Sequence, residues 1–142
     1  MRTWVHAVAS LILAGIFYPV FGLKALLILI GGILIDIDHY FWYAYKYKKL
    51  SLLDCYNHFS EQIKRNDFSE NYGILIIFHT VEFFLIAIAL SFYSKLMLVF
   101  LIGLLSHYVL DLIFLYTVPK RLIVNHSIVS WVIKNISRKI KS

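Results

Sequence analysis

Residues 23–43 read LKALLILIGGILIDIDHYFWY. The run is long enough for one membrane crossing, because a bilayer core of about 30 Å needs about 20 mostly apolar helical residues. Its second half also carries two aspartates and a histidine, which are costly at this depth and normally serve a function. We therefore predict a membrane-spanning helix that holds part of a polar site.

Three further runs have the same apolar character and predict three more crossings. They are Thr3–Tyr18, which ends at the Tyr18-Pro19 turn, then Tyr72–Tyr93, and finally Leu96–Tyr116. All are too long for membrane strands and lack the alternation of apolar and polar residues that such strands need. The sequence thus predicts an all-α, polytopic membrane protein with four transmembrane helices. The first run carries a histidine and lacks a believable cleavage site, so we expect a mature helix rather than a signal peptide.

The composition agrees with a membrane protein of one domain. The chain has 142 residues, of which 61% are hydrophobic and 15% charged, whereas soluble domains average about 25% charged residues. A soluble domain of this size cannot bury so much apolar surface. These values exclude a soluble globular protein, a disordered chain and a nucleic-acid-binding tail. The single cysteine, Cys55, excludes a disulfide framework.

Two polar segments are predicted to form short amphipathic helices on the membrane surface. In residues 44–71, Ser51 and Asp54 resemble a helix-capping box, and apolar residues follow at helical spacing. These are Leu52, Leu53, Tyr56, Phe59 and Ile63. In the tail, one face is formed by Leu122, Val129, Val132, Ile133, Ile136 and Ile140. We predict a metal-binding transmembrane domain over residues 1–118, with 44–71 as its cytoplasmic loop, and a basic amphipathic tail over residues 119–142.

The distribution of cations predicts the orientation. Twelve of the 14 lysines and arginines lie at the N-terminus, in the 44–71 loop or in the tail, whereas only Lys24 and Lys95 lie on the other side. Cytoplasmic segments of membrane proteins carry the excess of lysine and arginine. We therefore expect a multi-pass protein of the inner (cytoplasmic) membrane with both termini and the long loop in the cytoplasm.

Four acidic residues and four histidines lie inside the predicted spans, with no lysine or arginine deep enough to pair with them. The eight residues are His6, Asp36, Asp38, His39, His79, Glu82, His107 and Asp111. Carboxylates and imidazoles without a buried organic cation point to bound metal. A proton relay and hydrogen bonds between helices are the alternatives.

The spacing of these residues supports a shared site in the cytoplasmic leaflet. His107 and Asp111 are four residues apart, and His79 and Glu82 are three apart, so each pair would share one helix face. Asp36 and His39 are also three apart. Asp38 would point elsewhere on an ideal helix, so we expect it to support the ligands or the helix to unwind there.

In order and content these motifs resemble those of the YdjM-like inner-membrane metal-dependent hydrolases. The similarity covers roughly residues 4–115 and rests on His6, Asp36-Ile37-Asp38-His39, His79-Thr80 and His107-Tyr108-Val109-Leu110-Asp111. It implies that His6, Asp36, Asp38, His39, His79, His107 and Asp111 bind metal. The chain departs from the family pattern at Ile35, where a proline is usual, and it lacks the arginine that precedes the family's His-Ser pair.

Together these observations favour a metal-dependent hydrolase at the cytoplasmic leaflet. Mixed histidine and carboxylate ligands suit Zn²⁺, with Mn²⁺ or Fe²⁺ as alternatives, and the surplus of ligands favours two ions. Glu82 or Asp38 could act as the general base. Because the site lies below the headgroups, we expect an amphiphilic substrate such as a lipid phosphoester. A metal or proton transporter and a non-catalytic, metal-stabilised membrane scaffold remain open alternatives.

Overall fold

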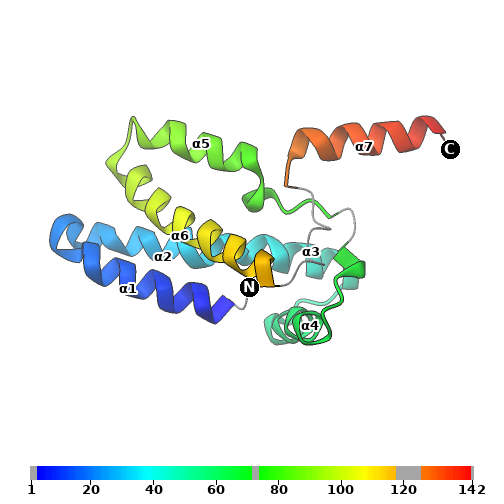
Figure 1. Cartoon of the computed structure of the whole chain (residues 1–142), viewed down its shortest axis with the longest axis horizontal. Coiled ribbons are helices and arrows are strands. Elements are labelled where there is room, and N and C mark those ends of the chain that lie inside the picture. Colours follow the sequence, from blue (N-terminus) through cyan, green and yellow to red (C-terminus); the bar gives the residue numbers. More distant parts are fainter. Residues whose placement is uncertain (1–2, 72–73, 118–125, 142) are drawn as a thin grey trace. The chain divides into compact units, whose positions relative to one another are not determined.

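The computed structural model describes residues 3–71, 74–117 and 126–141, and every regular element in these ranges is a helix (Figure 1). The predicted all-α class is therefore confirmed. Two helical stretches, Thr3–Tyr47 and Lys95–Phe114, are long and apolar enough to cross a membrane. The helices are α1 (Thr3–Phe21), η1 (Gly22–Ala25), α2 (Leu26–Ile33), η2 (Leu34–Asp36), α3 (Ile37–Tyr47), α4 (Leu52–Arg65), η3 (Ser69–Asn71), η4 (Ile77–His79), α5 (Val81–Ser91), α6 (Lys95–Thr117) and α7 (Ile128–Lys141).

Contacts divide the chain into two units, which we describe separately. The first unit comprises Met1–Ile37 and Leu85–Val118, and the second comprises Asp38–Phe84 and Pro119–Ser142. In the first unit, α1 and α2 form a helical hairpin (Figure 1). The expected end of the first helix at Tyr18 is three residues early, because α1 continues through Pro19 to Phe21. Gly22 then adopts φ +56°, a left-handed conformation that ends helices and favours glycine.

Glycines bring the backbones of α2 and α6 into close contact in the first unit. A Cβ at Gly103 would overlap the carbonyl oxygen of Ile28, and one at Gly31 would overlap that of Phe100. Ala14, Ile28 and Val99 form the small apolar core beside this contact. His107 follows Gly103 by one helical turn, so the close approach of the two helices also carries its ring toward α2.

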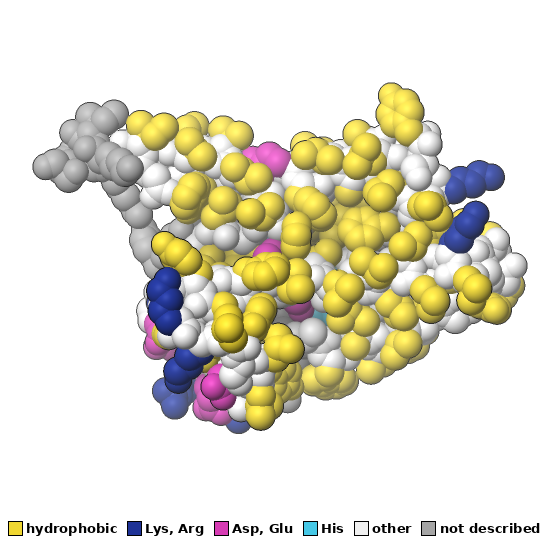
Figure 2. Space-filling model, turned by 180° about the vertical axis from the view of Figure 1, so that it is seen from behind, with side chains coloured by type: hydrophobic (Ala, Val, Ile, Leu, Met, Phe, Trp, Pro, Cys, Tyr) yellow, Lys and Arg dark blue, Asp and Glu magenta, His cyan; other side chains and the backbone are white. Residues whose placement is uncertain are grey.

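The outward surface of the first unit is strongly apolar. Leu11, Ile12 and Ile16 on α1 each expose more than half of their surface, as do Leu112 and Ile113 on α6. Figure 2 shows hydrophobic side chains spread over the helices of this unit. A soluble protein rarely exposes a contiguous apolar surface of this kind.

The prediction of one continuous helix over Tyr72–Tyr93 is wrong. Within the described residues of that run, the α-helix is α5, which covers only Val81–Ser91. Thr80 is extended, with φ −90° and ψ 152°, and its Oγ1 accepts a hydrogen bond from the Phe83 amide at 3.3 Å. Threonine favours this capping role over a position inside a helix. His79 therefore precedes the helix, and the expectation that it shares a helix face with Glu82 is also wrong.

Both predicted amphipathic helices are present in the second unit. Ser51 Oγ accepts a hydrogen bond from the Asp54 amide at 3.1 Å, as the capping motif predicts. Helix α4 starts at Leu52, directly after this cap. Asn66, in the left-handed conformation, ends this helix. In the tail, α7 begins at Ile128 after the capping residue Ser127. Leu122, which we predicted to lie on its apolar face, is outside the described residues.

Candidate metal-binding site

His6, Asp36, His107 and Asp111 come together in the first unit, and we call them the His6 group. The imidazole rings of His6 and His107 are stacked with their centroids 3.8 Å apart. Asp111, one turn after His107 on α6, lies with one carboxylate oxygen 3.5 Å from Nε2 of each histidine. One donor atom from each of these three residues falls within 4.8 Å of the others, as a shared cation requires.

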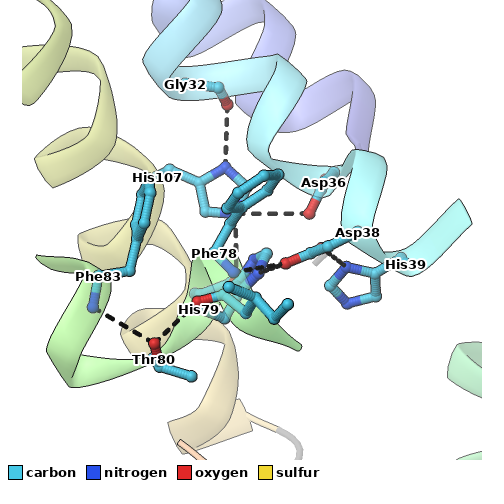
Figure 3. Close-up of polar contacts among 11 residues, drawn as sticks. Gly32, Asp36, Asp38, His39, Phe78, His79, Thr80, Phe83 and His107 are labelled. Atoms are coloured by element: carbon cyan, nitrogen blue, oxygen red, sulfur yellow. Dashed lines mark hydrogen bonds and ion pairs between the residues drawn. The ribbon is translucent and has the colours of Figure 1, made fainter. Parts of the chain in front are cut away.

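The orientation of His107 is fixed by the backbone of α2. Its Nδ1 lies 2.9 Å from the carbonyl oxygen of Gly32 (Figure 3). Because a carbonyl can only accept, Nδ1 donates this hydrogen bond, and Nε2 is left to face the carboxylates. Nε2 lies 3.5 Å from a carboxylate oxygen of Asp36 and 3.5 Å from one of Asp111. A backbone carbonyl bonded to the other ring nitrogen is the usual support of a metal-binding histidine.

His6 is the most informative member of the group. The residue is only 1% exposed, yet neither of its ring nitrogens has a hydrogen-bond partner within the part of the chain that the structure describes. A buried polar group without a partner costs about 1–3 kcal/mol. A cation bound between His6 and its carboxylate neighbour would remove this cost. The donor set, two imidazoles and up to two carboxylates, fits a tetrahedral Zn²⁺ site.

Asp36 reaches this group from a distorted part of the chain. After α2, Ile33 leaves helical geometry with φ −121° and ψ −51°, and residues 34–36 form the 3₁₀ turn η2. The predicted unwinding near the two aspartates is therefore observed. The Asp36 side chain is 19% exposed, and its Oδ1 faces His107 (Figure 3).

Asp38, His39 and His79 come together in the second unit, and we call them the Asp38 group. The Asp38 carboxylate lies 2.9 Å from His39 Nδ1 with one oxygen and 3.1 Å from His79 Nδ1 with the other (Figure 3). The second oxygen also accepts the Phe78 amide at 2.9 Å. All three side chains are at most 21% exposed. One donor atom of each falls within 4.8 Å of the others, so this group could also hold an ion.

The geometry gives Asp38 an orienting role. Both histidines face the Asp38 carboxylate with Nδ1. Metal-binding histidines are commonly oriented in this way, by a carboxylate bonded to the ring nitrogen that does not bind the metal. The hydrogen bond to the Phe78 amide in turn holds η4, the short turn that carries His79. That Asp38 supports metal ligands stays a prediction, with these hydrogen bonds as its structural basis.

Glu82 belongs to neither group in the described structure. Its Oε1 lies 2.6 Å from Ser127 Oγ and 3.3 Å from the Val129 amide, and its Oε2 accepts the Ile128 amide at 3.1 Å. The carboxylate thus satisfies free N–H groups at the start of α7, where the helix dipole also favours a negative charge. We call this contact the Glu82 clamp.

Replacing Glu82 with glutamine should loosen the start of α7 and leave metal content unchanged. The amide keeps one acceptor but turns an NH₂ group toward an N–H donor. Losing a helix cap costs about 1 kcal/mol, so amide exchange at positions 128 and 129 should become about fivefold faster. Hydrogen exchange and elemental analysis on the same preparation check this. Loss of metal would instead make Glu82 a ligand, and unchanged metal with an activity about 10²–10⁴-fold lower would make it the general base.

Two backbone groups at the site could not be recognised in the sequence. They are the Gly32 carbonyl, which orients His107, and the Phe78 amide, which holds Asp38. A glycine carbonyl and a phenylalanine amide are backbone groups, so the residue types at positions 32 and 78 give no hint of these distant partners. Comparisons with protein families, with curated proteins and with solved structures find no match for this chain.

Proposed function

We propose that this chain is a membrane-embedded, metal-dependent hydrolase that acts at the cytoplasmic leaflet on an amphiphilic substrate, namely a lipid phosphoester. The observation that carries the proposal is His6, a buried imidazole whose nitrogens have no hydrogen-bond partner among the described residues and which lies beside a second histidine and a carboxylate. The motif order shared with the YdjM-like hydrolases also supports it. A divalent ion held by these residues would polarise a phosphoryl or carbonyl oxygen and activate water.

In this proposal each of the two groups holds one ion. His6, His107 and Asp111 would bind one ion, with Asp36 completing its ligands. Asp38, His39 and His79 would together hold a second ion. Zn²⁺ suits these nitrogen and oxygen donors best, and Mn²⁺ or Fe²⁺ would also fit. Glu82 and Asp38 are the two candidates for the general base. Both carboxylates are hydrogen-bonded, Glu82 to the start of α7 and Asp38 to His39 and His79, so the Glu82→Gln variant decides between them.

Metal analysis is the direct test of this assignment. Chain purified in detergent should carry more than one divalent ion per molecule, because each group offers enough donors for its own ion. A chelator should abolish hydrolysis of a lipid phosphoester, and Zn²⁺ or Mn²⁺ should restore it. A folded preparation that binds neither metal would contradict the proposal. Metal binding without turnover of any amphiphilic ester, amide or phosphoester would favour the scaffold instead.

A membrane location explains the exposed apolar surface of the first unit. We propose four membrane-embedded segments, with α5 as a short one, and both termini and the 44–71 loop in the cytoplasm. In a Cys55→Ser background, single cysteines at positions 20, 50, 95 and 140 should separate into two classes. Impermeant reagent added from outside should label positions 20 and 95 only. Labelling of position 50 or 140 from outside would contradict this topology.

A further inference from the structure

Helix α7 presents an apolar face without a cover in the described structure. Val129, Val132, Ile133 and Ile136 are between 41% and 59% exposed. Their spacing places them on one side of the helix, as in helices that lie in the plane of a membrane interface. The 14-residue helix is too short to cross a bilayer. An apolar stripe of this kind therefore fits a surface rather than a span.

The charges of the tail indicate what that surface is. Residues 119–142 contain six lysines and arginines and no acidic residue. Four of these cations belong to α7: Lys134, Arg138, Lys139 and Lys141. In the helical register, positions 134, 138 and 141 lie opposite the apolar stripe, and position 139 borders it. A basic amphipathic helix of this pattern is complementary to the negative surface of a bilayer that contains anionic lipid.

The start of α7 is held in a defined place in the second unit. Besides the Glu82 clamp, the Val81 amide donates to the carbonyl oxygen of His126 at 2.9 Å. These bonds attach the helix to the first turn of α5, two residues after His79. These described bonds hold the first turn of α7 and therefore fix where the helix begins.

We propose that α7 docks on the anionic surface of a lipid bilayer, with its apolar stripe inserted between headgroups and its N-terminus held by the Glu82 clamp. The proposal rests on the membrane location in the proposed function, but not on metal binding or catalysis. It identifies the partner of the tail as anionic phospholipid. A second protein that covered the stripe would leave it insensitive to lipid charge.

A fluorophore on the stripe tests this in the full-length chain. In the Cys55→Ser background, Ile133→Cys is labelled with an environment-sensitive dye, and the matched control carries the same dye at Ser137→Cys, an exposed position off the stripe. Each chain is reconstituted into vesicles of phosphatidylcholine alone or of phosphatidylcholine with about 30% phosphatidylglycerol. At position 133 the emission should shift to the blue and brighten in the anionic vesicles, whereas position 137 should respond little.

Charge variants show whether the cations of α7 drive the response. Each basic residue near an anionic surface is worth about a fivefold change in partitioning, so Lys134→Gln with Arg138→Gln should weaken docking about 30-fold. Lys64→Gln with Arg65→Gln on α4 removes the same charge and should leave the position-133 signal unchanged. Raising the salt to about 1 M should also weaken docking, because screening then acts over about 3 Å.

The possible outcomes separate this proposal from the proposed function. A position-133 signal that ignores lipid charge, or equals that at position 137, would overturn the docking of α7. Failure of the chain to enter the vesicles would overturn the membrane location and, with it, this proposal. Docking in a chain that binds no metal would support α7 as a lipid-binding helix and contradict the hydrolase.

Discussion

His107→Ala should release the ion of the His6 group and lower stability in the same step. The ring supplies one donor nitrogen, stacks on His6 and bonds to Gly32. A ligand present at 100 to 1,000 times its dissociation constant stabilises the folded state by about 3–4 kcal/mol, and this contribution should disappear. Elemental analysis and thermal unfolding in detergent, with and without added Zn²⁺, measure both effects.

Two control variants make the result specific. His126→Ala removes a histidine outside both groups and should keep the full metal content. His79→Ala should lose the ion of the Asp38 group and retain the one bound by His6. If His107→Ala kept the metal content and the Zn²⁺-dependent stabilisation of the parent chain, the His6 group would not be a metal site.

Gly103→Ala should destabilise the first unit, although it adds only a methyl group. The new Cβ would overlap the Ile28 carbonyl and approach the Gly32 amide at 3.0 Å, so α2 and α6 would have to separate. Such overpacking costs about 1–3 kcal/mol or more. Because His107 bonds to Gly32 across the same contact, metal affinity should fall as well.

Gly15→Ala is the matched control for this variant. A Cβ at Gly15 would meet no atom within 4 Å, and alanine is favoured over glycine inside a helix by up to about 1 kcal/mol. Thermal unfolding should therefore rank Gly15→Ala at or above the parent chain and Gly103→Ala well below it. Equal stability of the two variants would contradict the packing argument.

Local sequence signals predicted the fold well where the deciding contacts are local. The Ser51 and Asp54 motif placed the start of α4 correctly, and the four-residue spacing of His107 and Asp111 placed both on one face of α6. The prediction for the third run, Tyr72–Tyr93, failed because the apolar composition of that run suits a helix along its whole length. There the capping of Thr80 and the bond between the Phe78 amide and Asp38 outweigh the helical preference of the residues before α5.

Contacts between distant segments explain what the sequence left open at the site. The sequence named His6 and Asp111 as candidates, but only the fold pairs them. Glu82 was a candidate ligand because its residue type and depth fit that role. Its carboxylate accepts hydrogen bonds from the amides of Ile128 and Val129, which lie 46 and 47 positions further along the chain, and no local pattern reveals such bonds.

The His6 group joins the first and last helices of its unit, with His6 and His107 about a hundred residues apart along the chain. An ion held by both would therefore act as a cross-link that closes a very long loop. In a disulfide, closing a loop of this length restricts the unfolded chain by about 4–5 kcal/mol. During synthesis α1 emerges first and α6 much later, so the ion could be captured only once the unit is nearly complete. Metal uptake would then mark finished assembly rather than begin it.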